Sequence, residues 1–256
     1  MDVRTDQLAK TSRLKLLGVQ GADEFHVAPM SAPSNLALPS LLDRLVGELS
    51  TLSVDHVQVR DFLHGLVVDA ITRREVPQEK LRAPRADIFL PAVEALRYSN
   101  SRQEIANLVA TNMDGRVAHT VLPAYIEVLK QISNDEIELL KRAPILGRFA
   151  PAADLLYVYS RGQTAVGYKH ILPEFLAKAC SVRSNIPQYV DNMMRLSLLE
   201  RPVGEEADDE HYRTLGKFEF VQELKRTAPP RSRVAVGKGV IGVTDFGDQF
   251  RRACLE

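Results

Sequence analysis

Apolar residues recur along the first half of the chain at the three- and four-residue spacing of amphipathic helices. The pattern predicts helices joined by short turns, over residues 41–49, 59–71, 88–98, 104–113 and 122–132. Ser101 with Glu104, and Ser133 with Glu136, have the spacing of a capping box, in which a hydroxyl and a carboxylate bind the free amides at a helix start. Residues 41–132 are therefore predicted to form a helical domain.

The pattern changes in the second half. The apolar run 155–159 fits a helix or a strand, and we interpret it as a helix; further helices are predicted over 171–180 and 186–199. Short runs of β-branched residues, 233–236 and 240–243, flank Gly237-Lys238-Gly239, which predicts a β-hairpin followed by a closing helix.

These elements predict a mainly α protein, a multi-helix bundle with a C-terminal winged-helix-like unit that contains one β-hairpin. The winged-helix-like unit is expected over residues 133–256, after the helical domain 41–132. Residues 1–40 mix glycines and prolines with small residues, a composition that predicts a flexible N-terminal lead.

The charge balance and the distribution of apolar residues argue against several classes of protein. The chain has 256 residues, with 33 basic and 33 acidic side chains. This balance argues against a general polyanion binder, because nucleic-acid proteins usually carry a basic excess. The first residues lack the apolar stretch of a secretory signal, and no window has the about 18 apolar residues of a membrane span. We therefore expect a cytoplasmic protein with no membrane partner, in which Cys180 and Cys254 are reduced thiols.

No motif in the sequence indicates catalysis. Gly237, Gly239 and Gly242 spell G-x-G-x-x-G, but the chain stops before the second parallel strand of a dinucleotide site, so we interpret these glycines as shaping the hairpin turn. The histidines lack metal-binding spacing, and no nucleophile has a flanking signature. The expectation is a protein that is not an enzyme and holds no cofactor or metal.

Two charged segments remain as candidate surfaces. An acidic run precedes the last third of the predicted winged-helix-like unit, at Glu205, Glu206, Asp208, Asp209 and Glu210, and is a candidate protein-binding strip. A basic set is the candidate nucleic-acid contact, because a wing can lie along phosphates; it comprises Arg195, Arg231, Arg233 and Lys238.

Three segments resemble a known family. They are EIANLVA at 104–110, VLKQIS at 128–133 and the tail VTDFGDQFRRAC at 243–254, and they are similar to the Abi-alpha (abortive-infection alpha) family of bacterial proteins. Val109 replaces a more usual leucine. The resemblance implies an α-helical bacterial protein associated with phage defence, and it brings no catalytic residues that could be transferred to positions here.

Two functional hypotheses follow. The first is a non-enzymatic bacterial conflict protein, either a phage-defence component or an immunity protein that masks a toxin, with a toxin or phage component as protein partner. The alternative is a winged-helix DNA-binding regulator that uses the basic set. The sequence leaves the oligomeric state open.

Overall fold

The computed structural model describes residues 38–48, 56–97, 101–143, 149–160 and 162–256. The predicted lead, residues 1–40, therefore falls almost entirely outside the described residues, and a helix already begins at Leu38. All described residues belong to the unit formed by residues 34–256.

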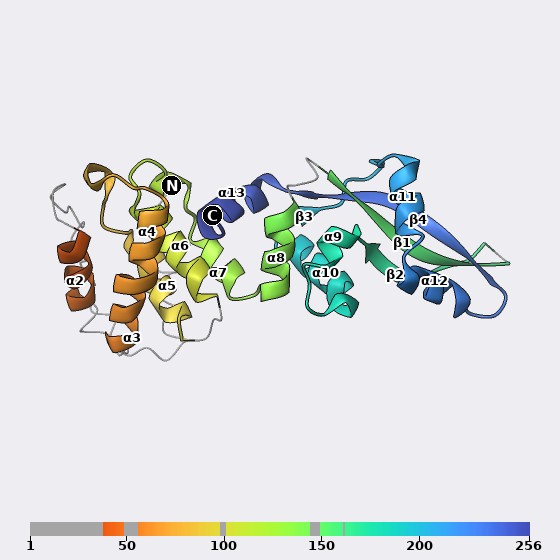
Figure 1. The fold of residues 1–256 in the computed structure, drawn as a ribbon, viewed down its shortest axis with the longest axis horizontal. Helices are drawn as coiled ribbons and strands as arrows, with labels where there is room; N and C mark the ends of the chain where they lie inside the picture. Colours follow the sequence, from red (N-terminus) through yellow and green to blue (C-terminus); the bar gives the residue numbers. More distant parts are fainter. Residues whose placement is uncertain (1–37, 49–55, 98–100, 144–148, 161) are drawn as a thin grey trace, which may run out of the picture. The chain divides into compact units, whose positions relative to one another are not determined.

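Helices make up the described chain as far as residue 142 (Figure 1). They are α2 (Leu38–Glu48), α3 (His56–Asp61), η2 (Phe62–Val67, a π-helix), α4 (Val68–Arg73), η3 (Gln78–Lys80), α5 (Ala86–Ala95), α6 (Arg102–Met113), η4 (Ala118–Thr120), α7 (Ala124–Leu129) and α8 (Asn134–Arg142). The capping box predicted at Ser133 and Glu136 is confirmed, since both of its hydrogen bonds form at the start of α8. At Ser101 the predicted side-chain cap does not form.

Strands and helices alternate in the rest of the chain. They are β1 (Phe149–Tyr159), β2 (Thr164–Ile171), α9 (Glu174–Ala177), η6 (Arg183–Asn185), α10 (Ile186–Arg195), β3 (Leu199–Glu200), α11 (Asp209–Leu215), α12 (Glu219–Arg226), β4 (Ser232–Val243) and α13 (Asp245–Cys254). The strands form one antiparallel sheet in the order β2-β1-β4-β3.

The predicted fold class is wrong, because the protein is a mixed α/β structure with a four-stranded sheet where one hairpin was expected. The run 155–159, interpreted as a helix, lies in β1. Of the predicted helix 171–180, only Glu174–Ala177 is α-helical, because Ile171 ends β2. A short apolar run reads alike in a buried helix and a strand, and here pairing with distant strands decides.

The predicted hairpin at 233–243 is also wrong. These residues form one continuous strand, and every residue of β1, from Phe149 to Tyr159, faces a residue of β4. A two-residue hairpin turn requires positive φ angles, whereas Gly162 and Gly204 are the glycines with positive φ in the described chain. Gly237 and Gly239 are therefore strand residues, and β1 pairs instead with β2 through a turn that contains Gly162.

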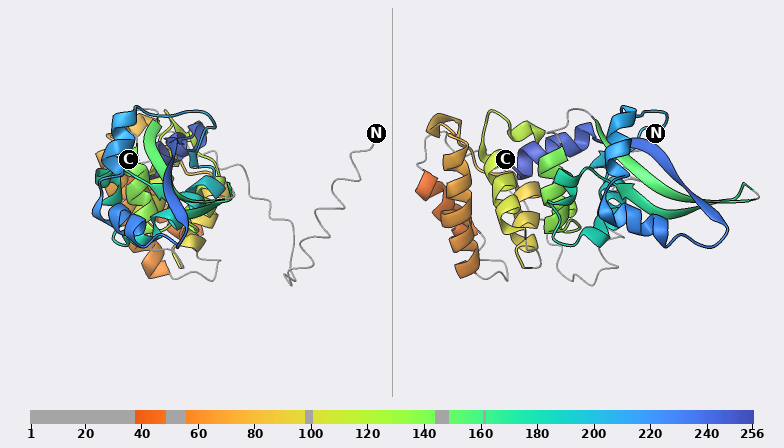
Figure 2. Two further views of the ribbon diagram at one scale, coloured as in Figure 1. Left: turned by 90° about the vertical axis from the view of Figure 1, so that its right-hand side faces the viewer. Right: turned by 45° about the vertical axis from the view of Figure 1, so that its right-hand side comes forward.

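The first core centres on α6, whose residues from Ile105 to Met113 are all buried. The C-terminal helix α13 packs against it (Figure 2). The amide of Asn107 donates a hydrogen bond to the carbonyl of Cys254, and the Arg74 guanidinium donates to the carbonyl of Ala253. The carbonyls at the end of α13, which have no partner within the helix, are thereby satisfied by α6 and by Arg74.

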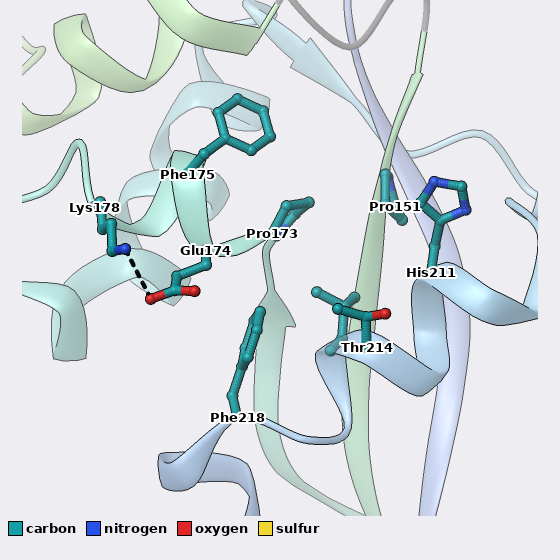
Figure 3. Close-up of a pocket in the computed structure, with 9 residues that line it drawn as sticks. Pro151, Pro173, Glu174, Phe175, Lys178, His211, Thr214 and Phe218 are labelled. Atoms are coloured by element: carbon teal, nitrogen blue, oxygen red, sulfur yellow. Dashed lines mark ion pairs between the residues drawn. The ribbon is translucent and has the colours of Figure 1, made fainter.

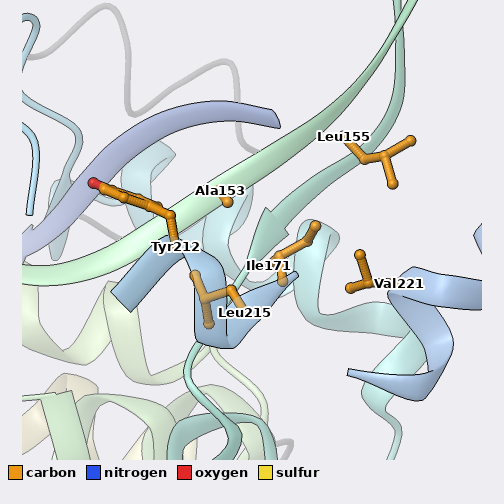
Figure 4. Packing of buried hydrophobic residues seen from close by; sticks show 6 residues of the cluster. All are labelled: Ala153, Leu155, Ile171, Tyr212, Leu215 and Val221. Atoms are coloured by element: carbon orange, nitrogen blue, oxygen red, sulfur yellow. The ribbon is translucent and has the colours of Figure 1, made fainter. Parts of the chain in front are cut away.

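A second core lies between the sheet and the helices α11 and α12. It consists of residues from strands and helices far apart in the sequence (Figure 4), namely Ala153, Leu155, Ile171, Tyr212, Leu215 and Val221. The hydroxyl of Tyr212 donates a hydrogen bond to the carbonyl of Gly239, 2.8 Å away. This bond and the apolar contacts fix α11 on one face of the sheet.

The two strand glycines offer a matched test of the β4 assignment. A Cβ atom on Gly239 would lie 2.9 Å from the Nε atom of Arg201, whereas the nearest atom to one on Gly237 would be the end of the Leu156 side chain, at 3.2 Å. Because Arg201 binds Asp154, we expect Gly239→Ala to be less stable than Gly237→Ala by about 1 to 2 kcal/mol in urea unfolding. Equal stabilities would contradict this packing.

Tyr125 is fully buried, and its hydroxyl has no hydrogen-bond partner among the described residues. The ring packs against Phe246 and Phe250, with centroid distances of 5.4 and 5.6 Å. Because a buried polar group without a partner is unfavourable, we expect Tyr125→Phe to leave the free energy of unfolding unchanged or to raise it by up to about 1 kcal/mol. A clear loss in thermal or urea denaturation would show that the hydroxyl is bonded.

Candidate functional site

An apolar cleft of about 380 Å³ opens beside α11 (Figure 3). Its walls come from β1, from the start of α9, from one face of α11 and from the residue that precedes α12. The lining residues are Pro151, Pro173, Glu174, Phe175, Lys178, His211, Thr214, Leu215 and Phe218. Proline, phenylalanine and leucine side chains form most of the surface, so the cleft suits an apolar group.

The polar groups of the cleft lie at its sides. Figure 3 shows Pro173 and Phe218 between the Glu174–Lys178 pair on one side and His211 with Thr214 on the other. The Lys178 ammonium lies 3.0 Å from the Glu174 carboxylate, and both side chains are 57% exposed. An exposed pair of this kind contributes little to stability. It provides a polar rim that a ligand or partner could contact.

The acidic run predicted as a protein-binding strip leads directly into α11. Asp209 lies 2.6 Å from the Lys238 ammonium, and this bond holds the pKa of the Asp209 carboxyl below its ordinary value. Glu206 approaches the same ammonium at 4.0 Å. The other three residues, Glu205, Asp208 and Glu210, are exposed and take part in no ion pair between described residues. They leave a negative surface at the start of α11, the helix whose His211 lines the cleft.

The predicted basic set does not gather on one surface. The guanidinium of Arg195 donates to Asn192 and to Gln131, so it is engaged within the fold. Arg233 and Lys238 both lie on β4 but are separated by an odd number of positions, which places their side chains on opposite faces of the sheet. Arg231, just before β4, is exposed.

A strained bulge near the end of β2 was not found by sequence reasoning. Asp154 of β1 lies opposite both Lys169 and His170, and His170 has a φ of +54°, in the left-handed region that favours glycine. The backbone amide of His170 donates to the Asp154 carboxylate at 3.0 Å, and Arg201 binds that carboxylate at 2.8 Å.

The bulge turns the His170 side chain towards α10. The ring is 4% exposed, and its Nε2 atom lies 2.9 Å from the Asp191 carboxylate, while Nδ1 has no partner in the described chain. The hydrogen bond with His170, helped by Lys169, lowers the pKa of Asp191. A histidine paired with a carboxylate is an arrangement used in proton transfer. The sequence shows His170 only as a single histidine, so the pair could not be predicted from it.

Residues 59–254 match the family described as abortive infection alpha. The chain belongs to this family. The resemblance of the three sequence segments is thereby confirmed, and the family description places the protein in the context of abortive infection.

Comparisons of this abortive infection alpha protein with solved structures and with curated proteins assign it no function. A solved structure of an uncharacterized protein from the marine bacterium Alcanivorax borkumensis SK2 is similar over 52% of this chain and 93% of that chain, at 13% identity and a TM-score of 0.35. A likeness at this level assigns neither fold nor function. No curated protein matches the chain. Within the described residues, none of the helices combines the length and apolarity needed to cross a membrane.

The two cysteine thiols of this family member have low reactivity. Burial raises the pKa of the Cys180 thiol to about 11 and that of the fully buried Cys254 thiol well above its ordinary value. Both are free in the structure and remain protonated near neutral pH, so they are weak nucleophiles. Among the described residues no group of three or more His, Cys, Asp or Glu side chains could hold a metal ion.

The contact between His170 and Asp191 predicts a pH-dependent contribution to stability. Because the pKa of Asp191 is lowered in the folded protein, its carboxylate stabilises the fold above the ordinary carboxyl pKa of about 4, and this stabilisation disappears as the pH falls through the folded pKa. We expect Asp191→Asn to be less stable than the wild type near neutral pH, with a difference that shrinks on acidification. Urea unfolding at several pH values measures it, and a constant difference would contradict the pairing.

Proposed function

We propose that this protein acts in abortive infection as a non-enzymatic binding protein that recognises a protein partner. The partner is a phage component or a toxin, and the protein binds it through the apolar cleft and the acidic residues beside it. The observation that carries the proposal is that both features meet at α11, because Glu205 and Asp208 precede this helix, Glu210 lies in its first turn, and the same helix lines the cleft.

The cleft has the character of an anchor site. Protein interfaces draw most of their affinity from a few apolar or aromatic side chains inserted into pockets, and charged residues at the rim set the rate and selectivity of association. Phe175 and Phe218 supply the apolar walls, and the acidic residues favour a partner with a basic surface around an apolar side chain. Val203, in the loop ahead of α11, is fully exposed and adds apolar surface beside the same charges.

The alternative of a DNA-binding regulator has weaker support. It was tied to a winged helix whose wing was the hairpin at 233–243, and that segment is a single strand of the sheet. Of the basic residues assigned to it, Arg233 and Lys238 lie on opposite faces of the sheet and Arg195 is engaged within the fold. Steep salt dependence of binding to duplex DNA would be its signature.

Thr214 provides a sharp test of the cleft. It lines the cleft, is exposed, and donates a hydrogen bond from its hydroxyl to the Glu210 carbonyl within α11. Thr214→Trp should fill the cleft without disturbing either core. In bacteria that produce the protein and are infected with phage, the wild type should reduce the number of phage released per infected cell, and Thr214→Trp should abolish this effect.

The matched control is Thr227→Trp. Thr227 is exposed and makes the equivalent bond to the Glu223 carbonyl, at the end of α12 and outside the cleft. It should protect as the wild type does. Reversal of the three exposed acidic charges to lysine should reduce protection as well. Full protection by Thr214→Trp and by the charge-reversed variant would contradict the proposed binding surface.

A further inference from the structure

A second hollow, of about 450 Å³, lies on the other side of α11. The residues of α11 that line the apolar cleft are His211, Thr214 and Leu215, whereas Asp209, Tyr212 and Arg213 line the second hollow. These two sets follow the three- and four-residue spacing that separates the faces of a helix. Lys217 and residues of α12 and β4 complete the lining of the second hollow. We call it the basic hollow.

The basic hollow carries an excess of positive charge. Four cationic side chains line it, Arg213, Lys217, Lys225 and Lys238, against one carboxylate, that of Asp209. Asp209 is bound to Lys238, and Arg213 and Lys217 are exposed and form no ion pair with another described residue. Three cations therefore surround the hollow without a carboxylate partner in it, although like charges gathered in this way repel one another.

Contacts within the fold hold two of the lysine side chains that line the hollow in place. The carbonyl of Gly216, in the turn between α11 and α12, accepts from the amide of Gln222 and, at 3.4 Å, from the ammonium of Lys225. On the other side, the Lys238 ammonium lies 5.7 Å from the centre of the Tyr212 ring, which is itself fixed by its bond to the Gly239 carbonyl. Two of the four cations are therefore positioned by the fold before any ligand binds.

We propose that the basic hollow binds the polyphosphate group of a small phosphorylated ligand. A chain of two or three phosphates carries several negative charges over a few ångströms, which matches the cations that α11, the turn after it and α12 contribute around one depression. Lysine ammonium groups bind phosphate as point charges, and arginine adds a forked pair of donors. The hydroxyl of Tyr212 already donates its hydrogen bond to the Gly239 carbonyl. The lysine and arginine side chains would therefore recognise the ligand through its phosphates.

The apolar cleft of the proposed protein-binding surface lies outside this site, whereas Asp209 of the acidic run belongs to the lining of the hollow. The apolar cleft and the basic hollow share no lining residue. A ligand in the hollow would contact α11 from the side opposite the cleft, and its binding is measured on the purified protein without a partner.

Calorimetric titration of the full chain with inorganic tripolyphosphate tests the proposal. The wild type should show saturable binding to one site, and Lys217→Gln/Lys225→Gln should weaken it by at least about tenfold, since two of the contacting charges are removed. The matched control, Lys130→Gln/Lys141→Gln, removes the same charge from the residue after α7 and from α8, and should leave the affinity within about twofold. Lys217→Glu should also weaken the binding of tripolyphosphate, and because Lys217 is exposed the substitution should leave folding unaffected.

Two results would overturn the proposal. Equal weakening in both double variants would show that tripolyphosphate responds only to net charge. Tighter binding of duplex DNA than of tripolyphosphate, lost in Lys217→Gln/Lys225→Gln, would assign the hollow to nucleic acid instead.

Discussion

The pairing of β1 with β4 is the constraint on which the second half of the structure depends. Each residue of β1 faces one of β4, so a segment near the end of the chain is fixed along a strand that begins some eighty positions earlier. Because the strands run side by side, Gly239 of β4 lies against Arg201 and Tyr212, and Gly237 lies against Leu156 of β1. The same pairing places Lys238 within reach of the acidic run before α11.

This arrangement positions α11 so that it lines both hollows. Its buried residues Tyr212 and Leu215 attach it to the sheet, and the exposed residues on either side of that attachment line two hollows of different character. One is walled by phenylalanine and proline, the other by lysine and arginine. A short helix bound to a sheet through its centre can thus present two surfaces, an apolar one that suits a protein anchor and a basic one that suits an anion.

Much of the helical half could be predicted from the sequence, because the contacts that define a helix are local. The capping residues Ser133 and Glu136 and the stripe that became α7 are examples. The sheet could not be predicted in the same way. Gly237-Lys238-Gly239 has the composition of a turn, and only the strand opposite shows that it is extended. The run 155–159 was ambiguous for the same reason.

The candidate site divides along similar lines. The acidic run is visible in the sequence as a cluster of charges, although its partial neutralisation by Lys238 is not. The cleft was missed because its walls come from Pro151, Pro173 and Phe218, which share no sequence pattern. The bulge at His170 was missed because strain at one residue depends on the register of two strands.

The register between β1 and β4 can be measured directly by nuclear magnetic resonance of the labelled protein. The structure predicts nuclear Overhauser contacts between backbone protons of Asp154 and Gly237 and of Leu156 and Ala235. Contacts that join residues 233–236 to residues 240–243 in place of these would show a hairpin, and they would contradict the sheet, the position of α11 and both hollows that depend on it.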